Sequence, residues 1–277
     1  MANVLAQSKQ EAVIHLLVEG NSIRSIERIT GVHRDTICRL LVKIGNKCRE
    51  FLDAKMRGLK LKHLELDEIW TFVAKKQAMI QPEEFDGAIG DQYMYVAIDQ
   101  ETKLIPTFAL GKRDSAVTRV FINDLAERIV SEYPQISTDG FIPYVGAIRE
   151  AFGNEAAHGV LVKDFAHNDY DQPGRYGPPS MIAANREQMT GLHDIPLHTI
   201  CTSHVERNNV NIRMFVKRFT RLTLAFSKKL ENLAAAAALY VAYHNFCRVP
   251  RKLRITPAMA AGVTDHIWEL DELLAAI

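Results

Sequence analysis

The chain has 277 residues, of which 47% are hydrophobic and 24% are charged, and its formal net charge is +1. This composition is typical of a globular protein with room for more than one domain. No apolar run reaches the ~20 residues that a membrane-spanning helix needs, and the polar start of the chain does not resemble a signal peptide. We therefore expect a cytoplasmic protein without a membrane partner.

The small net charge conceals a segregation of charge along the chain. Residues 1–62 carry a net charge of +6 and residues 207–254 carry +10, whereas residues 63–206 carry −11. Two basic blocks could hold a nucleic acid while the acidic middle supplies carboxylates for metal binding. The four cysteines are scattered and form no CxxC pair, which argues against a zinc site and against a disulfide framework.

Residues 8–46 have the pattern of three short helices. The second helix is expected to follow an N-cap at Ser22, and a tight turn at 30–32 separates it from a third that begins at His33. Apolar residues around a turn glycine are typical of a helix-turn-helix, whose third helix enters the major groove. The exposed side chains expected to contact DNA there are Arg34, Thr36 and Arg39. Docking to another protein is the alternative for such a helical bundle.

From residue 63 onward the pattern alternates between strands and helices. Hydrophobic runs predict five strands, at residues 63–74, 93–99, 104–110, 135–140 and 159–165. Helices are predicted at residues 114–132, 141–152, 228–246 and 264–274, the second of them opened by Pro143. Residues 166–200 are predicted to form a long loop.

Residues 203–229 are predicted to form one basic helix with two faces. The apolar stripe consists of Ile212, Phe215, Val216 and Phe219, and the opposite side carries Glu206, Arg213, Lys217 and Arg221. Residues 207–254 contain eleven Lys or Arg and one acidic residue. Such a cationic surface calls for a polyanion as its partner, and Glu206 at its head has the position of a metal ligand beside a phosphate backbone.

Three carboxylates lie on separate predicted elements. Asp67 lies in the first strand, Asp139 ends the fourth, and Glu206 is in the basic helix. The first and fourth strands can be neighbours in a mixed sheet, and gathered carboxylates repel one another unless divalent cations neutralise them. Mg²⁺ suits oxygen ligands, and two such ions can clamp the attacking and leaving oxygens of a phosphoryl displacement.

Several motifs occur together in an order that is specific to one family. They are ELDEIW at 65–70, STDGFIPY at 137–144, HVERNN at 204–209 with RFTRL and AFSKKLEN after it, and TPAMAAGVTDHIWEL at 256–270. With these motifs the chain resembles the insertion-sequence transposases of the DDE type, in the group named for the first bacterial insertion element. The resemblance covers nearly the whole chain from Leu61 on, and residues 166–200 look inserted relative to the shortest family pattern.

The resemblance implies an α/β fold: a ribonuclease-H-like mixed sheet flanked by helices, preceded by the all-α helix-turn-helix domain. It implies that Asp67, Asp139 and Glu206 are the catalytic, metal-binding triad of a two-metal-ion DNA transposase. Such an enzyme binds the terminal inverted repeats of its element, cleaves the DNA, and transfers the freed 3′-hydroxyl to target DNA. The implied cofactor is Mg²⁺ as two ions, with Mn²⁺ able to substitute.

The implied partners are double-stranded DNA and further copies of the chain, since synapsis of two element ends calls for a homodimer or larger assembly. The protein would act in the bacterial cytoplasm, at the nucleoid. The side chains expected to hold DNA from the basic block are Arg207, Asn209, Arg213, Lys217, Arg218, Arg221, Lys228 and Lys229. His204 and Asn209 could also orient Glu206.

The expected organisation is a helix-turn-helix domain at residues 1–50, a basic linker at 51–62, a catalytic domain at 63–250 with the insertion 166–200, and a tail at 251–277. Two alternatives stay open. One is a nuclease or resolvase of the same fold without strand transfer. The other is a helix-turn-helix transcription regulator, which gives no reason for three carboxylates beside a cationic helix. Glu68 and Asp99 are poorer candidates for metal binding, because Glu68 should point to the opposite face of its strand.

Overall fold

The computed structural model describes residues 5–84, 86–165 and 181–277. At its N-terminal end lie α1 (Gln7–Val18), α2 (Ile23–Thr30) and α3 (Arg34–Lys55). The Ser22 hydroxyl accepts the backbone N–H of Ser25 at 3.1 Å and caps α2, as the sequence predicts. Gly31 adopts the left-handed conformation with φ 69°, which ends α2 and turns the chain into α3.

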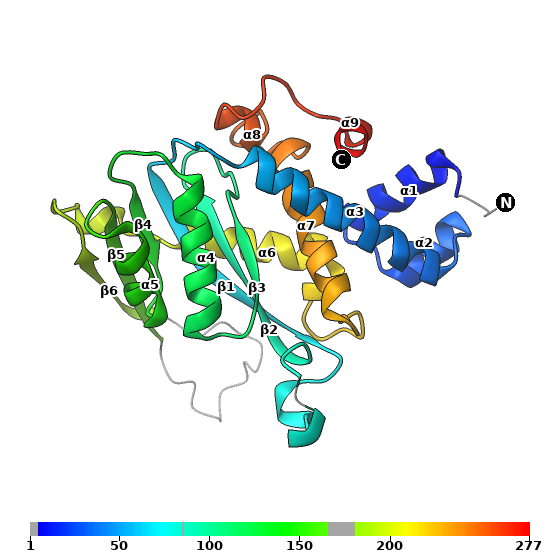
Figure 1. Cartoon of the computed structure of the whole chain (residues 1–277), viewed down its shortest axis with the longest axis horizontal. Helices are drawn as coiled ribbons and strands as arrows, with labels where there is room; N and C mark the ends of the chain where they lie inside the picture. Colours follow the sequence, from blue (N-terminus) through cyan, green and yellow to red (C-terminus); the bar gives the residue numbers. More distant parts are fainter. Residues whose placement is uncertain (1–4, 85, 166–180) are drawn as a thin grey trace.

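Six strands form one mixed sheet in the order β3-β2-β1-β4-β5-β6 (Figure 1). They are β1 (His63–Val73), β2 (Gly90–Asp99), β3 (Phe108–Gly111), β4 (Gln135–Thr138), β5 (Ala157–Phe165) and β6 (Met181–Thr190). The first three strands form an antiparallel meander, and β4 and β5 run parallel to β1. This topology is ribonuclease-H-like and confirms the predicted fold class.

Helices cover both faces of this sheet. α4 (Ser115–Arg128) and α5 (Pro143–Phe152) pack together on one face, and α6 (Ser203–Phe215) packs on β1 and β2 from the other, as Figure 1 shows. The remaining helices are α7 (Leu230–Phe246), α8 (Pro257–Ala260) and α9 (Leu270–Ala276). Short 3₁₀ turns occur at η1 (Gln77–Met79), η2 (Pro82–Glu84), η3 (Leu197–Thr199) and η4 (Lys217–Phe219). Within the described ranges, no helix is long and apolar enough to cross a membrane.

The long helix α7 connects the N-terminal helices to the sheet. It packs along α3 so closely that a Cβ atom added to Gly45 would lie 2.4 Å from the carbonyl oxygen of Ala235. At its other end the buried amide of Asn245 accepts the backbone N–H of Ile105 at 3.0 Å and donates to the carbonyl of the same residue at 2.9 Å. One continuous cluster of buried apolar side chains therefore extends from α1 to the sheet.

The predicted single helix over residues 203–229 is wrong beyond Phe215. α6 ends there, and side chains take up carbonyl oxygens on both sides of its end: the Thr220 hydroxyl donates to the carbonyl of Arg213 in the last turn, and the Thr71 hydroxyl donates to that of Arg218 beyond it. Val216 is in an extended conformation. Members of the apolar stripe on both sides of this break, Ile212, Val216 and Phe219, are nevertheless all buried.

The predicted loop over residues 166–200 also needs correction, because its second half contains β6 and η3; residues 166–180 lie outside the described residues. β6 pairs antiparallel with β5 at the edge of the sheet. Its side chains are not sorted into a buried and an exposed face, and Ile182 is 71% exposed, so no alternating apolar pattern marks it as a strand. The predicted C-terminal helix is shorter than expected and begins only at Leu270.

Candidate active site

Strand β1 presents two carboxylates to α6 from the same face. The fully buried Glu65 accepts the backbone N–H groups of His204 at 2.7 Å and Val205 at 2.9 Å, both through Oε2. These N–H groups belong to the first turn of α6, which has no partner within its own helix, so Glu65 caps the helix from a distant strand. Glu65 is not among the site residues predicted from the sequence. The signal was available, since Glu65 lies two positions before Asp67 and must share its face.

Asp67 is held against the same helix one turn further along. Its Oδ2 atom accepts a hydrogen bond of 2.8 Å from the side-chain amide of Asn209, and its Oδ1 accepts the backbone N–H of Glu68 at 2.8 Å. Asn209 lies three residues after Glu206 on α6, so both side chains are on neighbouring positions of the helix surface. The cap at Glu65 and the Asn209 bond together determine how α6 sits on β1.

Asp139 reaches this position through the pairing of β1 with β4. The parallel register pairs His63 with Gln135 and Glu65 with Ser137, so its continuation by two residues places Asp139 beside Asp67. Asp139 follows β4 directly, and its Oδ1 accepts the backbone N–H of Phe141 at 2.9 Å. The side chain of Asp139 is 41% exposed, so a ligand in solution can reach it.

Electrostatic coupling shows that the three carboxylates share one neighbourhood. Burial, together with the negative charges of Glu68, Asp139 and Glu206, raises the pKa of Asp67 to about 7. Glu206 is half-exposed and is bound by the Lys163 ammonium and by the Thr202 hydroxyl at 2.6 Å. Among the residues that the structure describes, Asp67, Asp139 and Glu206 do not form a group in which one oxygen of each carboxylate lies within 4.8 Å of the other two.

The donor set nevertheless fits hard divalent cations. It consists of carboxylate oxygens on separate elements, it is open to solvent at Asp139 and Glu206, and its members repel one another at Asp67.

Glu68 lies on the opposite face of β1, where its side chain is only 3% exposed. It accepts the Tyr144 hydroxyl of α5 at 3.0 Å and pairs with Arg113, which also lies 3.9 Å from Asp139. Burial raises the pKa of Glu68, and the charge of Asp139 adds to this effect. Arg113 therefore links the second face of β1 to the acidic centre. Asp99 instead closes a turn by accepting the backbone N–H of Thr102 at 2.8 Å.

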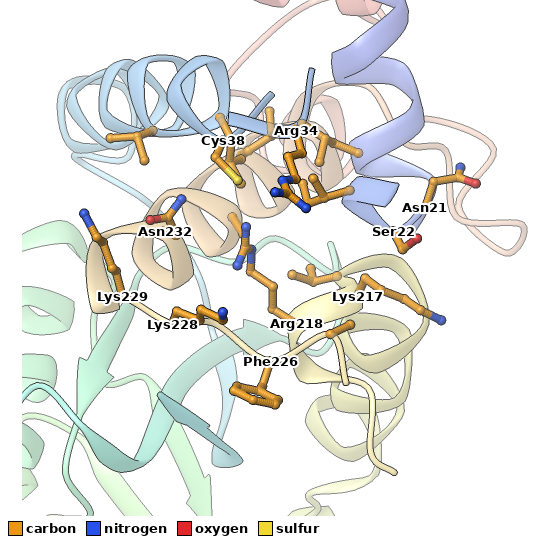
Figure 2. A pocket seen from close by; sticks show the side chains of 18 of the residues that line it. Asn21, Ser22, Arg34, Cys38, Lys217, Arg218, Phe226, Lys228, Lys229 and Asn232 are labelled. Atoms are coloured by element: carbon orange, nitrogen blue, oxygen red, sulfur yellow. The ribbon is translucent and has the colours of Figure 1, made fainter. Parts of the chain in front are cut away.

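The residues expected to contact DNA fall into two groups. The first lines a cavity of about 1090 Å³ between α3, α7 and the segment 215–229, and its members are Arg34, Arg39, Lys217, Arg218, Lys228 and Lys229. Arg24 and Lys43 bring the lining to eight cations against two acidic residues. Figure 2 shows Arg34 and Arg218 reaching into this cavity from its two sides. Burial lowers the pKa of the Arg218 guanidinium, which donates to the Ser227 hydroxyl at 2.9 Å.

The second group lies around α6. Arg207 and Arg221 are exposed, whereas Arg213 donates to the backbone carbonyls of Trp70 at 3.4 Å and Phe219 at 3.0 Å. Burial lowers the pKa of Arg213 to about 10. Arg213 therefore has partners inside the protein, in contrast to the outward position that the single-helix prediction gave it, and Asn209, which was expected to hold DNA or orient Glu206, instead donates to Asp67. Thr36 lies near the start of α3 and is half-buried.

The fold and the site together define a ribonuclease-H-like domain with an acidic centre that is assembled from β1, the end of β4 and α6. A family model described as a DDE domain, that of IS240-type transposases, matches residues 88–171. This segment is thus similar to the DDE domain of a transposase family that typically has catalytic members using divalent metal ions. It includes Asp139 but neither Asp67 nor Glu206.

The chain was also compared with solved structures and with curated proteins. Among solved structures, the chain is similar to a piggyBac transposase in a synaptic complex with hairpin DNA, with 10% sequence identity and a TM-score of 0.39. The similarity covers 99% of this chain and 72% of the other. No curated protein matches the sequence at a significant level. The resemblance to DDE transposases is confirmed, and the matching model is that of the IS240 type rather than the group named for the first insertion element.

Proposed function

We propose that the protein is a DNA transposase whose catalytic centre is formed by Asp67, Asp139 and Glu206. The observation that supports this most directly is the geometry of β1. On one face of this strand, Glu65 accepts backbone N–H groups of α6 and Asp67 accepts the side-chain amide of Asn209. The register of the parallel neighbour β4, continued by two residues, has Asp139 beside Asp67. Separate elements thereby bring three carboxylates into one electrostatic neighbourhood, beside a surface rich in Lys and Arg.

In this proposal the three carboxylates and the two residues that support them have separate tasks. Asp67, Asp139 and Glu206 would hold two Mg²⁺ ions, or Mn²⁺ in their place. When bound, such ions stabilise the charge on the attacking and leaving oxygens of an in-line displacement at phosphorus. Asn209 orients the Asp67 carboxylate through its amide, and Glu65 maintains the position of the helix that carries Glu206. The reaction would cleave the phosphodiester at the end of a mobile element and then join the freed 3′-hydroxyl to target DNA.

The DNA would be held by the cationic groups on both sides of the acidic centre. Arg34 and Arg39 at the start of α3 are exposed, as a recognition helix requires, and Lys228 and Lys229 continue the same basic surface. In this proposal residues 1–50 read the terminal inverted repeat, 51–62 connect, 63–250 perform catalysis and 251–277 form a tail. Synapsis of two ends would involve at least two copies of the chain.

The experiment that tests the proposal compares DNA binding with cleavage in Asp139→Asn. Glu132→Gln serves as the matched control, since Glu132 is an exposed carboxylate of the acidic block outside the proposed centre. We expect Asp139→Asn to abolish metal-dependent cleavage of a labelled element end while a gel shift shows nearly unchanged binding. Cleavage retained at the wild-type rate would remove Asp139 from the active site.

A second assay separates transposase from the alternatives. A labelled, pre-cut element end is incubated with target DNA and Mg²⁺, and the products are resolved on a gel. A joined product supports strand transfer. Cleavage of uncut DNA without any joined product would identify a nuclease or resolvase, and binding without either reaction would identify a regulator.

A further inference from the structure

A second group of ligand-bearing side chains lies at the N-terminal end of α6. Glu65, Cys201 and His204 each offer one ligand atom, and these three atoms all lie within 4.8 Å of one another. Cys201 and His204 have the local spacing Cys-x-x-His, and Glu65 comes from β1. In the part of the chain that the structure describes, this is the one group of three such side chains that is close enough for a single ion.

The hydrogen bonds of Glu65 leave one of its oxygens available to such an ion. Oε2 is engaged by the backbone N–H groups of α6, whereas Oε1 lies 2.7 Å from Nδ1 of His204. A carboxylate oxygen and an imidazole nitrogen at this distance share one proton. A metal ion could replace this proton without disturbing the cap on α6.

Cys201 is positioned by the backbone just before α6. Its Sγ atom accepts the backbone N–H of Ser203 at 3.4 Å and lies 3.0 Å from the hydroxyl of the same residue. Its own backbone N–H donates to the Ser137 hydroxyl of β4 at 3.4 Å. The thiol is thus held between the sheet and the helix, on the side where Glu65 and His204 meet.

The absence of a CxxC pair argued against a zinc site in the sequence, but the three ligands that the fold brings together favour a metal different from that of the acidic centre. Thiolate, imidazole and carboxylate are the side chains that bind Zn²⁺, while Mg²⁺ takes oxygen ligands. A thiolate and a carboxylate together carry two negative charges, which balance a divalent ion. The nearby Lys103 ammonium, whose pKa is lowered mainly by burial, donates its hydrogen bond to the carbonyl of Gln100.

We propose that Glu65, Cys201 and His204 bind one Zn²⁺ ion that fastens α6 to β1. Binding forms bonds to Oε1, Sγ and Nδ1 and releases the thiol proton, while the proton between Glu65 and His204 moves to Nε2 so that the imidazole binds as a neutral ligand, and water takes the fourth position. Asp67 lies two residues after Glu65, and Glu206 two residues after His204. The ion would therefore keep β1, which carries Asp67, and α6, which carries Glu206, at a constant separation. This inference stands independently of the proposed DNA chemistry.

Cobalt substitution tests the proposal directly. The full-length protein is treated with a chelator, dialysed and titrated with CoCl₂, and the absorption spectrum is recorded. We expect a thiolate-to-cobalt charge-transfer band whose intensity corresponds to one thiolate-bound Co²⁺ per chain, whatever further Co²⁺ the acidic centre binds, and which ZnCl₂ removes. Cys201→Ser should abolish the band and weaken Co²⁺ binding at least tenfold. Cys247→Ser, at another partly buried cysteine, should keep both.

Two further measurements distinguish an ion bound at Cys201 from an ion bound at the acidic centre. Asp139→Asn should retain the charge-transfer band, because an ion bound only at the acidic centre has no sulfur ligand. Zn²⁺ should raise the melting temperature of the wild type and of Asp139→Asn but not that of Cys201→Ser, with circular dichroism as the check on folding. The absence of a charge-transfer band in the wild type, or its persistence in Cys201→Ser, would overturn the proposal.

Discussion

The close approach of α3 and α7 makes Gly45→Ala a sharp test of the architecture. The Cβ atom of an alanine at this position would lie 2.4 Å from the carbonyl oxygen, 2.5 Å from Cα and 2.6 Å from Cβ of Ala235. Ordinary van der Waals contact begins at 3.4 Å, so the two helices have to separate by about 1 Å. Because most of the obstructing atoms belong to the backbone, rotation of a side chain cannot relieve the overlap.

The expected magnitude follows from two opposing effects. Alanine is a better helix former than glycine by about 1 kcal/mol, which favours the variant. Overpacking of a well-packed core costs about 1–3 kcal/mol, and contact with backbone places this site at the upper end. We expect a net loss of about 2 kcal/mol in the free energy of unfolding. Gly146→Ala is the matched control: Gly146 is also helical, in α5, and an added Cβ meets no atom within 4 Å, so this variant should gain up to about 1 kcal/mol.

Urea unfolding followed by circular dichroism measures both variants. The decisive quantity is the difference between them, about 3 kcal/mol, since it cancels the helix propensity that they share. If Gly45→Ala proves as stable as Gly146→Ala, α3 and α7 do not pack at this distance, and the reasoning is refuted.

Three further predictions concern the site, the DNA surface and the pH dependence of stability. Asn209→Ala removes the donor that orients Asp67, and we expect cleavage to slow about 10–100-fold. DNA binding in a gel shift should not change. The control Val210→Ala, at an exposed neighbour on α6, should cleave DNA at the wild-type rate. Lys228→Ala should reduce the slope of log affinity against log salt concentration by about one, if this side chain contacts a phosphate; an unchanged slope would place Lys228 away from the DNA. Burial lowers the pKa of His244 to about 4, so below pH 6.5 the unfolded chain binds a proton that the folded chain does not. Acidification from pH 7 to 5 should therefore remove about 2 kcal/mol of stability through this group, and His244→Gln should show a correspondingly flatter dependence in urea unfolding.

Local signals in the sequence were sufficient for most elements. Ser22 caps its helix and Gly31 turns the chain, as their residue types predict, because capping and a positive φ depend on a few neighbouring atoms. Pro143 opens α5 for the same reason. The apolar runs that predict β1 and β5 are clear, since these strands bury side chains on both faces of the sheet over most of their lengths.

Some features depend on contacts between distant segments, and no local pattern contains them. Beyond the end of α6 at Phe215, the carbonyl of Arg218 accepts the Thr71 hydroxyl on β1, which lies far away in the sequence. β6 forms because β5 offers an unpaired edge, whereas its own residues have no apolar periodicity. The distance between Gly45 and Ala235 likewise appears only when two helices meet.

The candidate site divides in the same way. The sequence alone predicted Asp67, Asp139 and Glu206 as a group, because the two aspartates lie in or at the end of apolar strands and Glu206 is an acidic residue at the head of a basic helix. Only the tertiary structure revealed that Glu65 caps α6 and lies with Cys201 and His204 in one cluster. The physical reason is that the sequence around Glu65 indicates only which face of β1 it shares with Asp67, whereas the N–H groups and side chains that its carboxylate meets belong to distant residues and depend on how the strand and the helix pack.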